Sequence, residues 1–155
     1  MMAVADGDGE RVCGVLGVEH RPGQKRAHHH GDLALAAMAD ADVHIVTLTV
    51  TEKGYRLDPA TGDLLLSDAD VAADLVDIAA PRTAPGFIVA ALQARRAAGR
   101  KPFTVISCDN LPHNGKRIRA GVIAMARRID PSLAERRFSG TITLERQIES
   151  EIAGD

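Results

Sequence analysis

Four polar side chains stand together where an apolar run of the chain ends. They supply a hydroxyl, a thiol, a carboxylate and an amide, in the order Ser107, Cys108, Asp109 and Asn110. A thiol can act as a nucleophile, a carboxylate can accept a proton, and an amide can donate a hydrogen bond to an oxygen that gains negative charge. The same residue types also form tight turns by bonding to the backbone. The residues alone leave both interpretations open, with the turn slightly favoured.

A second polar cluster follows another apolar run earlier in the chain. It consists of Thr49, Val50, Thr51 and Glu52. Open parallel sheets bind ligands at the carboxyl ends of their strands. When the two runs are neighbouring strands, both clusters face one crevice, where Asn110 offers an amide donor and Glu52 offers a carboxylate.

Two other reactive features favour simpler explanations. Cys108 has no convincing partner apart from His113, so a small packed residue at a strand end is favoured over a nucleophile. The run of three histidines from His28, with His20 before it, suggests a metal site. Adjacent histidines cannot all face one ion in a regular element, and the i, i+4 spacing of a helical zinc site is absent. A solvated loop is favoured there.

Two β-branched runs are predicted as strands that position the clusters. Residues 43–50, VHIVTLTV, show no clear alternation, as expected for a strand covered on both faces of a parallel sheet. Residues 102–108, PFTVISC, are predicted as the second strand. A third strand is expected within residues 12–18. Residues 55–66 carry Pro and Gly at turn positions between two short arms, which predicts a hairpin.

Helices are predicted between and after these strands. One begins at Ser67 or Asp68, with Val71, Leu75 and Val76 on one side. The next starts near Pro85 and stops at Gly99. Asn110 or Asn114 caps a third, which Pro131 ends and whose apolar stripe is Ile118, Val122, Met125 and Ile129. Shorter helical patterns cover residues 32–40 and, weakly, residues 144–152. Strand, helices, strand and helix in this order predict a parallel α/β fold.

Composition restricts the classes of partner. The 155 residues suit one domain, and 45% hydrophobic with 26% charged residues argue against disorder. Aromatics at 3% offer few stacking surfaces, and a net charge of -2 gives no field for nucleic acid or anionic membrane. Two distant cysteines and the lack of an apolar run of about 18 residues predict a cytoplasmic protein with no nucleic-acid or membrane partner.

Three stretches resemble the mannitol dehydrogenase and fructuronate reductase family of polyol-specific long-chain dehydrogenases. They are IVTLTVTEKGY at residues 45–55, PRTAPGFIVAALQARRAAGRKPFTV at residues 81–105 and SCDNLPHNG at residues 107–115. The resemblance runs from about Val43 to Arg136 and includes the LDPATGD hairpin. It is specific, because several motifs agree in both sequence and separation. It implies a Rossmann-like domain and NAD(P)-dependent oxidation of a polyol or sugar acid to a ketose, in the mannitol/fructose or mannonate/fructuronate class.

The resemblance also implies roles for the two clusters. Asn110 matches the family asparagine that hydrogen-bonds the reacting oxygen, and Asp109 beside it is assigned to the substrate side. Glu52 matches an acidic residue close to the active site, and the Thr49, Val50 and Thr51 segment falls where the nicotinamide half of the cofactor passes. NAD is the expected cofactor from family habit, and NADP stays open because the acidic residue that selects between them is not identified.

Departures from the family pattern shape the domain expectation. The family's glycine motif is not intact, with a partial match at Arg26-Ala27-His28, and neither Lys53 nor Lys116 matches the catalytic lysine of the family's C-terminal domain. We therefore expect a poorly defined segment over residues 1–40, an incomplete Rossmann-like parallel sheet with a hairpin insertion over residues 41–137, and a divergent tail over residues 138–155 without the C-terminal domain.

This organisation predicts a truncated dehydrogenase that is weakly active or inactive alone. The alternative is a non-catalytic nucleotide-binding or interaction module derived from the same family. In either case the face on which the C-terminal domain would pack is expected to be prone to association. We therefore expect self-association or a complementary domain as partner.

Overall fold

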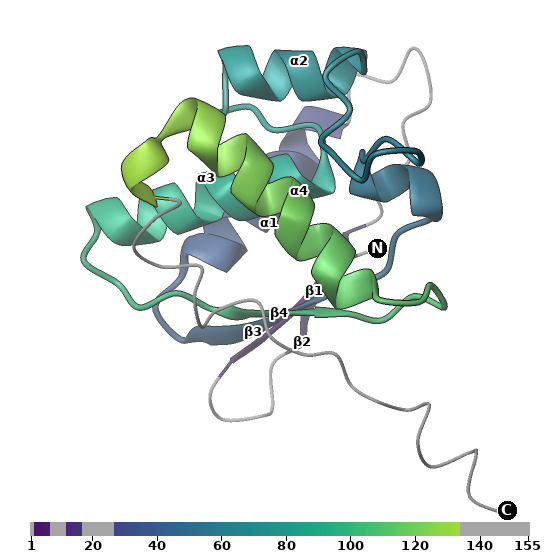
Figure 1. The fold of residues 1–155 in the computed structure, drawn as a ribbon. Helices are drawn as coiled ribbons and strands as arrows, with labels where there is room; N and C mark the ends of the chain where they lie inside the picture. The colour runs from purple at the N-terminus through teal and green to yellow at the C-terminus, as the bar shows by residue number, and fades with distance from the viewer. Residues whose placement is uncertain (1, 7–11, 17–26, 134–155) are drawn as a thin grey trace, which may run out of the picture.

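The computed structural model (Figure 1) describes residues 2–6, 12–16 and 27–133, and the side chains from residue 31 onward. Within these ranges one sheet contains β1 (Met2–Asp6), β2 (Val12–Leu16), β3 (Val43–Leu48) and β4 (Thr104–Ser107), in the order β2-β1-β3-β4. β3 and β4 are parallel, whereas β1 is antiparallel to both of its neighbours. The sheet is therefore mixed, and the predicted parallel arrangement holds for the β3 and β4 pair.

Helices cover one face of this sheet. They are α1 (Ala27–Ala39), the short 3-10 helix η1 (Glu52–Tyr55), α2 (Ala69–Val76), α3 (Ala84–Ala97) and α4 (Asn114–Ile129). Figure 1 shows α1, α3 and α4 above the sheet, with α2 beyond them. α3 contacts both α1 and α4, and α4 also contacts β4. The Rossmann-like α/β class predicted from the sequence is confirmed.

An aliphatic core lies between the sheet and the helices. Its fully buried members include Met38, Val46, Val71, Ile88, Val89, Ile118, Val122 and Met125. Val46 and Leu48 of β3 are buried, whereas Ile45, which points to the opposite face by strand alternation, is 39% exposed. Covering on both faces was therefore the wrong prediction for β3, because the helices of the described ranges all lie on one side.

Local signals set the ends of the helices. Asp68, one of the two predicted caps, accepts hydrogen bonds from the backbone N–H groups of Asp70 and Val71 at the start of α2. Gly99 follows α3 with a φ of 67°, a left-handed conformation that glycine adopts without steric cost. Pro131 lies two residues after the last residue of α4. The predicted start of α2 and the predicted stops of α3 and α4 are confirmed.

The predicted hairpin is a tight turn with a single bridge. Leu57 pairs antiparallel with Leu64, and Gly62 between them has a φ of 74°. The Asp58 carboxylate accepts from the backbone N–H groups of Ala60 and Thr61 at 2.7 and 3.2 Å. These bonds close the turn from within, so the hairpin forms without longer strands.

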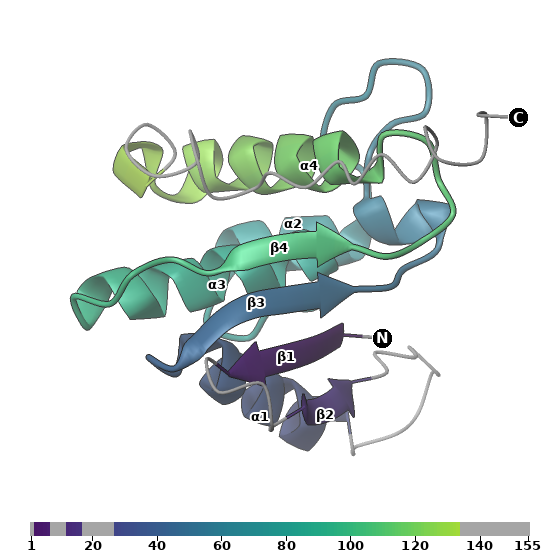
Figure 2. The same ribbon diagram turned by 90° about the horizontal axis from the view of Figure 1, so that it is seen from below.

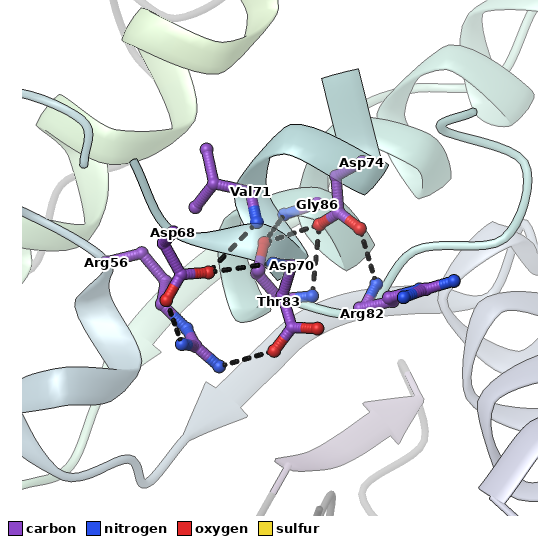
Figure 3. A network of polar contacts seen from close by, with 8 residues as sticks. All are labelled: Arg56, Asp68, Asp70, Val71, Asp74, Arg82, Thr83 and Gly86. Atoms are coloured by element: carbon purple, nitrogen blue, oxygen red, sulfur yellow. Dashed lines mark hydrogen bonds and ion pairs between the residues drawn. The ribbon is translucent and has the colours of Figure 1, made fainter. Parts of the chain in front are cut away.

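Arg56 fastens the hairpin to α2. Its guanidinium forms ion pairs with Asp68 at 2.6 Å and with Asp70 at 3.1 Å, as Figure 3 shows. All three side chains are largely shielded from solvent, and a guanidinium that contacts two carboxylates through separate nitrogens is geometrically restricted. The hairpin is therefore held against the first turn of α2.

Two local predictions are wrong, and a third concerns residues that the structure does not describe. Val76 was expected on the packed side of its helix but is 89% exposed, because α2 ends at that residue and Asp77 is extended. The prediction of a loop at His28 to His30 is wrong for the backbone. These residues are helical, because the helix of the following Ala-rich segment begins at Ala27. The weak helix at residues 144–152 lies outside the described residues.

A buried carboxylate joins the end of α2 to the start of α3. The Asp74 side chain is fully buried, and one of its oxygens accepts from the backbone N–H of Arg82 at 2.7 Å. The other oxygen accepts from the backbone N–H of Thr83 at 3.0 Å and from its hydroxyl at 2.6 Å. Thr83 in turn caps α3 by accepting from the backbone N–H of Gly86 at 3.0 Å, as drawn in Figure 3. The two helices therefore share one hydrogen-bonded cluster.

This carboxylate gives stability a pH dependence of known sign. Burial raises the pKa of Asp74, and its hydrogen bonds to Thr83 and Arg82 lower it only in part. The native state then holds the proton more tightly than the unfolded chain, so this contribution to stability falls as pH rises through the native pKa. We expect the unchanged protein to lose stability relative to Asp74→Asn as pH rises from about 4. Urea unfolding of both proteins across pH measures this, and a difference that is constant, or that grows in favour of the unchanged protein, would contradict it.

Candidate functional site

The two polar clusters leave the sheet at the same edge. β3 and β4 pair in parallel with Leu48 opposite Ser107, and the backbone N–H of Cys108 donates to the Leu48 carbonyl at 2.8 Å. Figure 2 shows that both strands point to the same side of the molecule. The carboxyl ends of neighbouring parallel strands therefore bring residues 49–52 and 108–110 together, as the sequence predicted.

The first cluster is largely open to solvent. Thr49 and Thr51 are exposed and Val50 is half-buried. Glu52 begins η1 with a side chain that is 64% exposed, and its carboxylate lies 3.8 Å from the guanidinium of Arg117 in α4. An exposed pair at this distance contributes little to stability. The segment is thus available to a ligand along the edge of the sheet.

Asn110 and Asp109 differ sharply in their surroundings. Asn110 is exposed, and its side chain makes no hydrogen bond to any residue that the structure describes. Asp109 is half-buried, and one carboxylate oxygen accepts from the backbone N–H of Leu111 at 3.1 Å. Its other oxygen accepts from the Ser107 hydroxyl at 3.0 Å and from the Tyr55 hydroxyl. Asp109 therefore has the bonding of a turn residue, while the Asn110 amide is presented outward.

Tyr55 belongs to this site although no motif analysis singled it out. It ends η1 and is 1% exposed, and its hydroxyl lies 2.6 Å from the Ser107 hydroxyl. It is the only tyrosine of the sequence, in a mainly aliphatic core whose other aromatic members among the described residues are Phe87 and Phe103. A buried phenol usually needs a hydrogen-bond partner, so this composition was the available signal that a polar group lies next to it.

Cys108 is exposed, which corrects the prediction that it packs at a strand end. The side chains of a strand alternate between its two sides, and Ser107 is buried toward the helices. Cys108 consequently projects the other way, with its sulfur 3.8 Å from the Ile106 carbonyl. We assign Cys108 no role in the chemistry of the site.

Asn114 closes the loop that carries the second cluster. The residue that caps α4 is His113, with a φ of 57°, so the prediction of Asn110 or Asn114 as cap is wrong. Asn114 lies in the first turn instead, where its amide nitrogen donates to the carbonyls of Ser107 and Asp109 at 3.2 and 3.0 Å. Its side chain ties the end of β4 to the start of α4.

The described part of the chain contains neither a metal-binding cluster nor a membrane-spanning helix. Among residues 31–133, whose side chains the structure describes, no three side chains of His, Cys, Asp or Glu are placed to hold a metal ion. No helix within residues 2–6, 12–16 and 27–133 is long and apolar enough to span a bilayer. The strand-end edge is therefore the candidate that we develop.

Comparison with protein families relates most of the chain to known enzymes. Residues 11–138 match the family model described as the mannitol dehydrogenase Rossmann domain. The mannitol 2-dehydrogenase of Cereibacter sphaeroides is 50% identical over 100 residues, which cover 64% of this chain and 21% of that enzyme. The D-mannonate oxidoreductase of Escherichia coli K12 is 48% identical over 100 residues, with the same coverage. The chain thus spans about a fifth of the length of the curated relatives that it matches.

Solved structures give the same result. The crystal structure of D-sorbitol dehydrogenase in its substrate-free form superposes with a TM-score of 0.64 at 43% identity. The ternary complex of the Pseudomonas fluorescens mannitol 2-dehydrogenase with NAD and D-mannitol superposes with a TM-score of 0.63 at 41% identity. Each match covers 66% of this chain and 21% of the known structure.

Proposed function

Since the chain belongs to the mannitol dehydrogenase family, we propose that it is the cofactor-binding part of an NAD(P)-dependent oxidoreductase that interconverts a polyol or sugar acid with a ketose. The observation that carries the proposal is the strand-end edge, where the exposed Asn110 amide stands beside residues 49–52. The names of the relatives suggest mannitol or mannonate as the substrate class.

The residues at this edge fit the nicotinamide half of the cofactor. Thr49 and Thr51 are exposed at the carboxyl end of β3, and the half-buried Val50 offers an apolar surface between them. A carboxyl-end crevice between parallel strands is where open α/β sheets bind dinucleotides. NAD would supply the carbon that accepts or returns the hydride, and NAD is favoured over NADP because the related Pseudomonas fluorescens mannitol 2-dehydrogenase binds NAD in its ternary complex.

Asn110 has the chemistry needed at the reacting oxygen. Removal of a hydride from a carbinol carbon leaves charge on its oxygen as the hydroxyl proton departs, and a fixed amide N–H stabilises that charge. Glu52 stands at the same edge and is assigned to the wall of the site. Neither Lys53 nor Lys116 matches the lysine that serves as base in the family, so we assign the base to neither.

A titration of the purified 155-residue chain tests this function. We expect measurable affinity for NADH and absent or very slow polyol-dependent formation of NADH, because the residues assigned here include no base. We further expect Asn110→Ala to keep the NADH affinity and to weaken binding of fructose to the NADH complex about tenfold, the effect of losing one good hydrogen bond. Calorimetry measures both affinities, and Thr61→Ala in the hairpin is the control.

The outcomes separate the two classes of function. Absence of NADH binding by the unchanged chain would contradict the cofactor site. NADH binding without any fructose binding would favour a non-catalytic nucleotide-binding module of the same family. The observation that favours a non-catalytic interaction module is the exposed Ile45, on the face of β3 that no described helix covers.

A further inference from the structure

We propose that Tyr55 and Asp109 are positioning residues that hold the two strand-end loops in one arrangement and so fix Asn110 relative to Glu52. The inference rests on the proposed function, because it concerns the same site. It differs from the expectation that Asp109 binds substrate, and it assigns a role to Tyr55 that no motif suggested.

Tyr55 and Asp109 come from different loops and meet in the interior. Tyr55 lies at the end of η1, three residues after Glu52, and its ring is packed in the core. Its hydroxyl donates to the Asp109 carboxylate and also contacts the Ser107 hydroxyl. The first loop is therefore bonded to the residue that immediately precedes Asn110.

The available hydrogens give this contact a direction. Tyr55 and Ser107 each bring one hydroxyl hydrogen, whereas the ionised Asp109 carboxylate brings acceptors and no donor. Tyr55 donates to Asp109, and the Ser107 hydrogen goes to either Asp109 or the Tyr55 oxygen. A charged acceptor makes these bonds stronger than neutral ones, so the carboxylate is the centre that holds both hydroxyls.

The second loop is restrained on both sides of Asn110. Before it, the Asp109 side chain bonds the interior hydroxyls, and its other oxygen accepts from the backbone N–H of Leu111 at 3.1 Å. After it, Asn114 donates to the carbonyls of Ser107 and Asp109. Asn110 is thus the residue of this turn whose side chain has no partner among the described residues, on a backbone whose neighbours are fixed.

The hydrogen bonds of Asp109 favour a positioning role over direct contact with the substrate. Each of its oxygens already accepts from a group within the protein, and one of them accepts twice. Preorganised donors are effective only when their supports are rigid. Asp109 therefore acts through Asn110, and Tyr55 extends the same support to the loop of Glu52.

Two variants and a matched control test this role. Tyr55→Phe removes the hydroxyl and keeps the packed ring, and Asp109→Asn keeps the side-chain shape. Asp58→Asn is the control, because Asp58 also accepts from the backbone N–H two residues ahead, at 2.7 Å, but its other bonds remain within the hairpin. The readouts are the amide NMR spectrum of the chain, including the side-chain amide of Asn110, and the affinities for NADH and for fructose in its presence.

Coupling between the loops predicts a specific pattern. Tyr55→Phe should shift the backbone amides of residues 108–111 and the Asn110 side-chain amide, and Asp109→Asn should shift the amides of residues 52–55. Both should weaken fructose binding about tenfold while NADH affinity stays within about twofold. Asp58→Asn should change neither the Asn110 amide nor fructose binding.

Other outcomes would overturn the proposal. If the Asn110 amide resonance does not shift in either variant, the cluster is structural support alone. The same conclusion follows if NADH affinity and fructose affinity fall equally, in proportion to a loss of melting temperature. If the unchanged chain binds no NADH, the proposed function fails, and the NMR comparison decides the positioning role by itself.

Discussion

Replacement of Gly86 by alanine is expected to destabilise the protein by about 3 to 5 kcal/mol, a large share of the stability of an ordinary domain. A methyl group built at Gly86 lies 2.0 Å from a carboxylate oxygen of Asp74 and 3.1 Å from the Thr83 hydroxyl. The carboxylate cannot move aside without breaking its three hydrogen bonds, because it is fully buried. A carboxyl group that loses its hydrogen-bond donors inside a core is among the most costly of single-residue defects.

A matched glycine and a double mutant control this experiment. Gly31 is also helical, but a methyl there meets the Phe87 ring at 3.3 Å, where a small shift suffices and alanine's higher helix propensity compensates by about 1 kcal/mol. Gly31→Ala should therefore change stability by less than about 1 kcal/mol. Gly86→Ala should cost far less in an Asp74→Ala background, where the clash is gone. Urea unfolding measures the unchanged protein, the three single variants and the double variant, and equal costs of Gly86→Ala in both backgrounds would reject the clash.

Local chemistry explains which parts of this fold could be predicted from the sequence. The Asp68 cap, the stop at Gly99 and the stripe of Ile118, Val122 and Met125 each depend on neighbours within a few residues, and all are found in place. The resemblance of residues 45–55 to a known family added the Rossmann-like class. The mixed sheet could not be predicted, because β1 pairs with β3 across some forty residues and its own sequence is short and weakly patterned.

In the candidate site, too, features set by local patterns could be predicted from the sequence, whereas long-range contacts could not. The common edge of residues 49–52 and 108–110 follows from two strand patterns and the rule for parallel neighbours. The contact of Tyr55 with Ser107 spans 52 residues and depends on the register of β3 against β4, which no local pattern specifies. The exposure of Cys108 was likewise missed, because it depends on which face of β4 the helices cover.

Loss of the Arg95 guanidinium is expected to cost about as much as the glycine change, by a different mechanism. Arg95 is 1% exposed, and its Nε donates to the Lys101 carbonyl at 2.6 Å. Its Nη1 donates to the carbonyls of Met38, at 3.1 Å, and of Asp40, and the group lies 5.5 Å from the centroid of the Phe103 ring. One side chain therefore joins the end of α1, the end of α3 and the approach to β4.

Arg95→Met keeps the aliphatic stem but leaves three carbonyls without this donor, so we expect a loss of about 3 kcal/mol or more in urea unfolding. Arg95→Lys should recover little, because a single ammonium cannot replace donors that point in separate directions from a planar fork. Arg96→Met is the control: its guanidinium is 42% exposed and pairs with Asp130 at 3.3 Å, so it should cost less than about 1 kcal/mol. Equal losses for Arg95→Met and Arg96→Met would show that the buried guanidinium is not what joins these three segments.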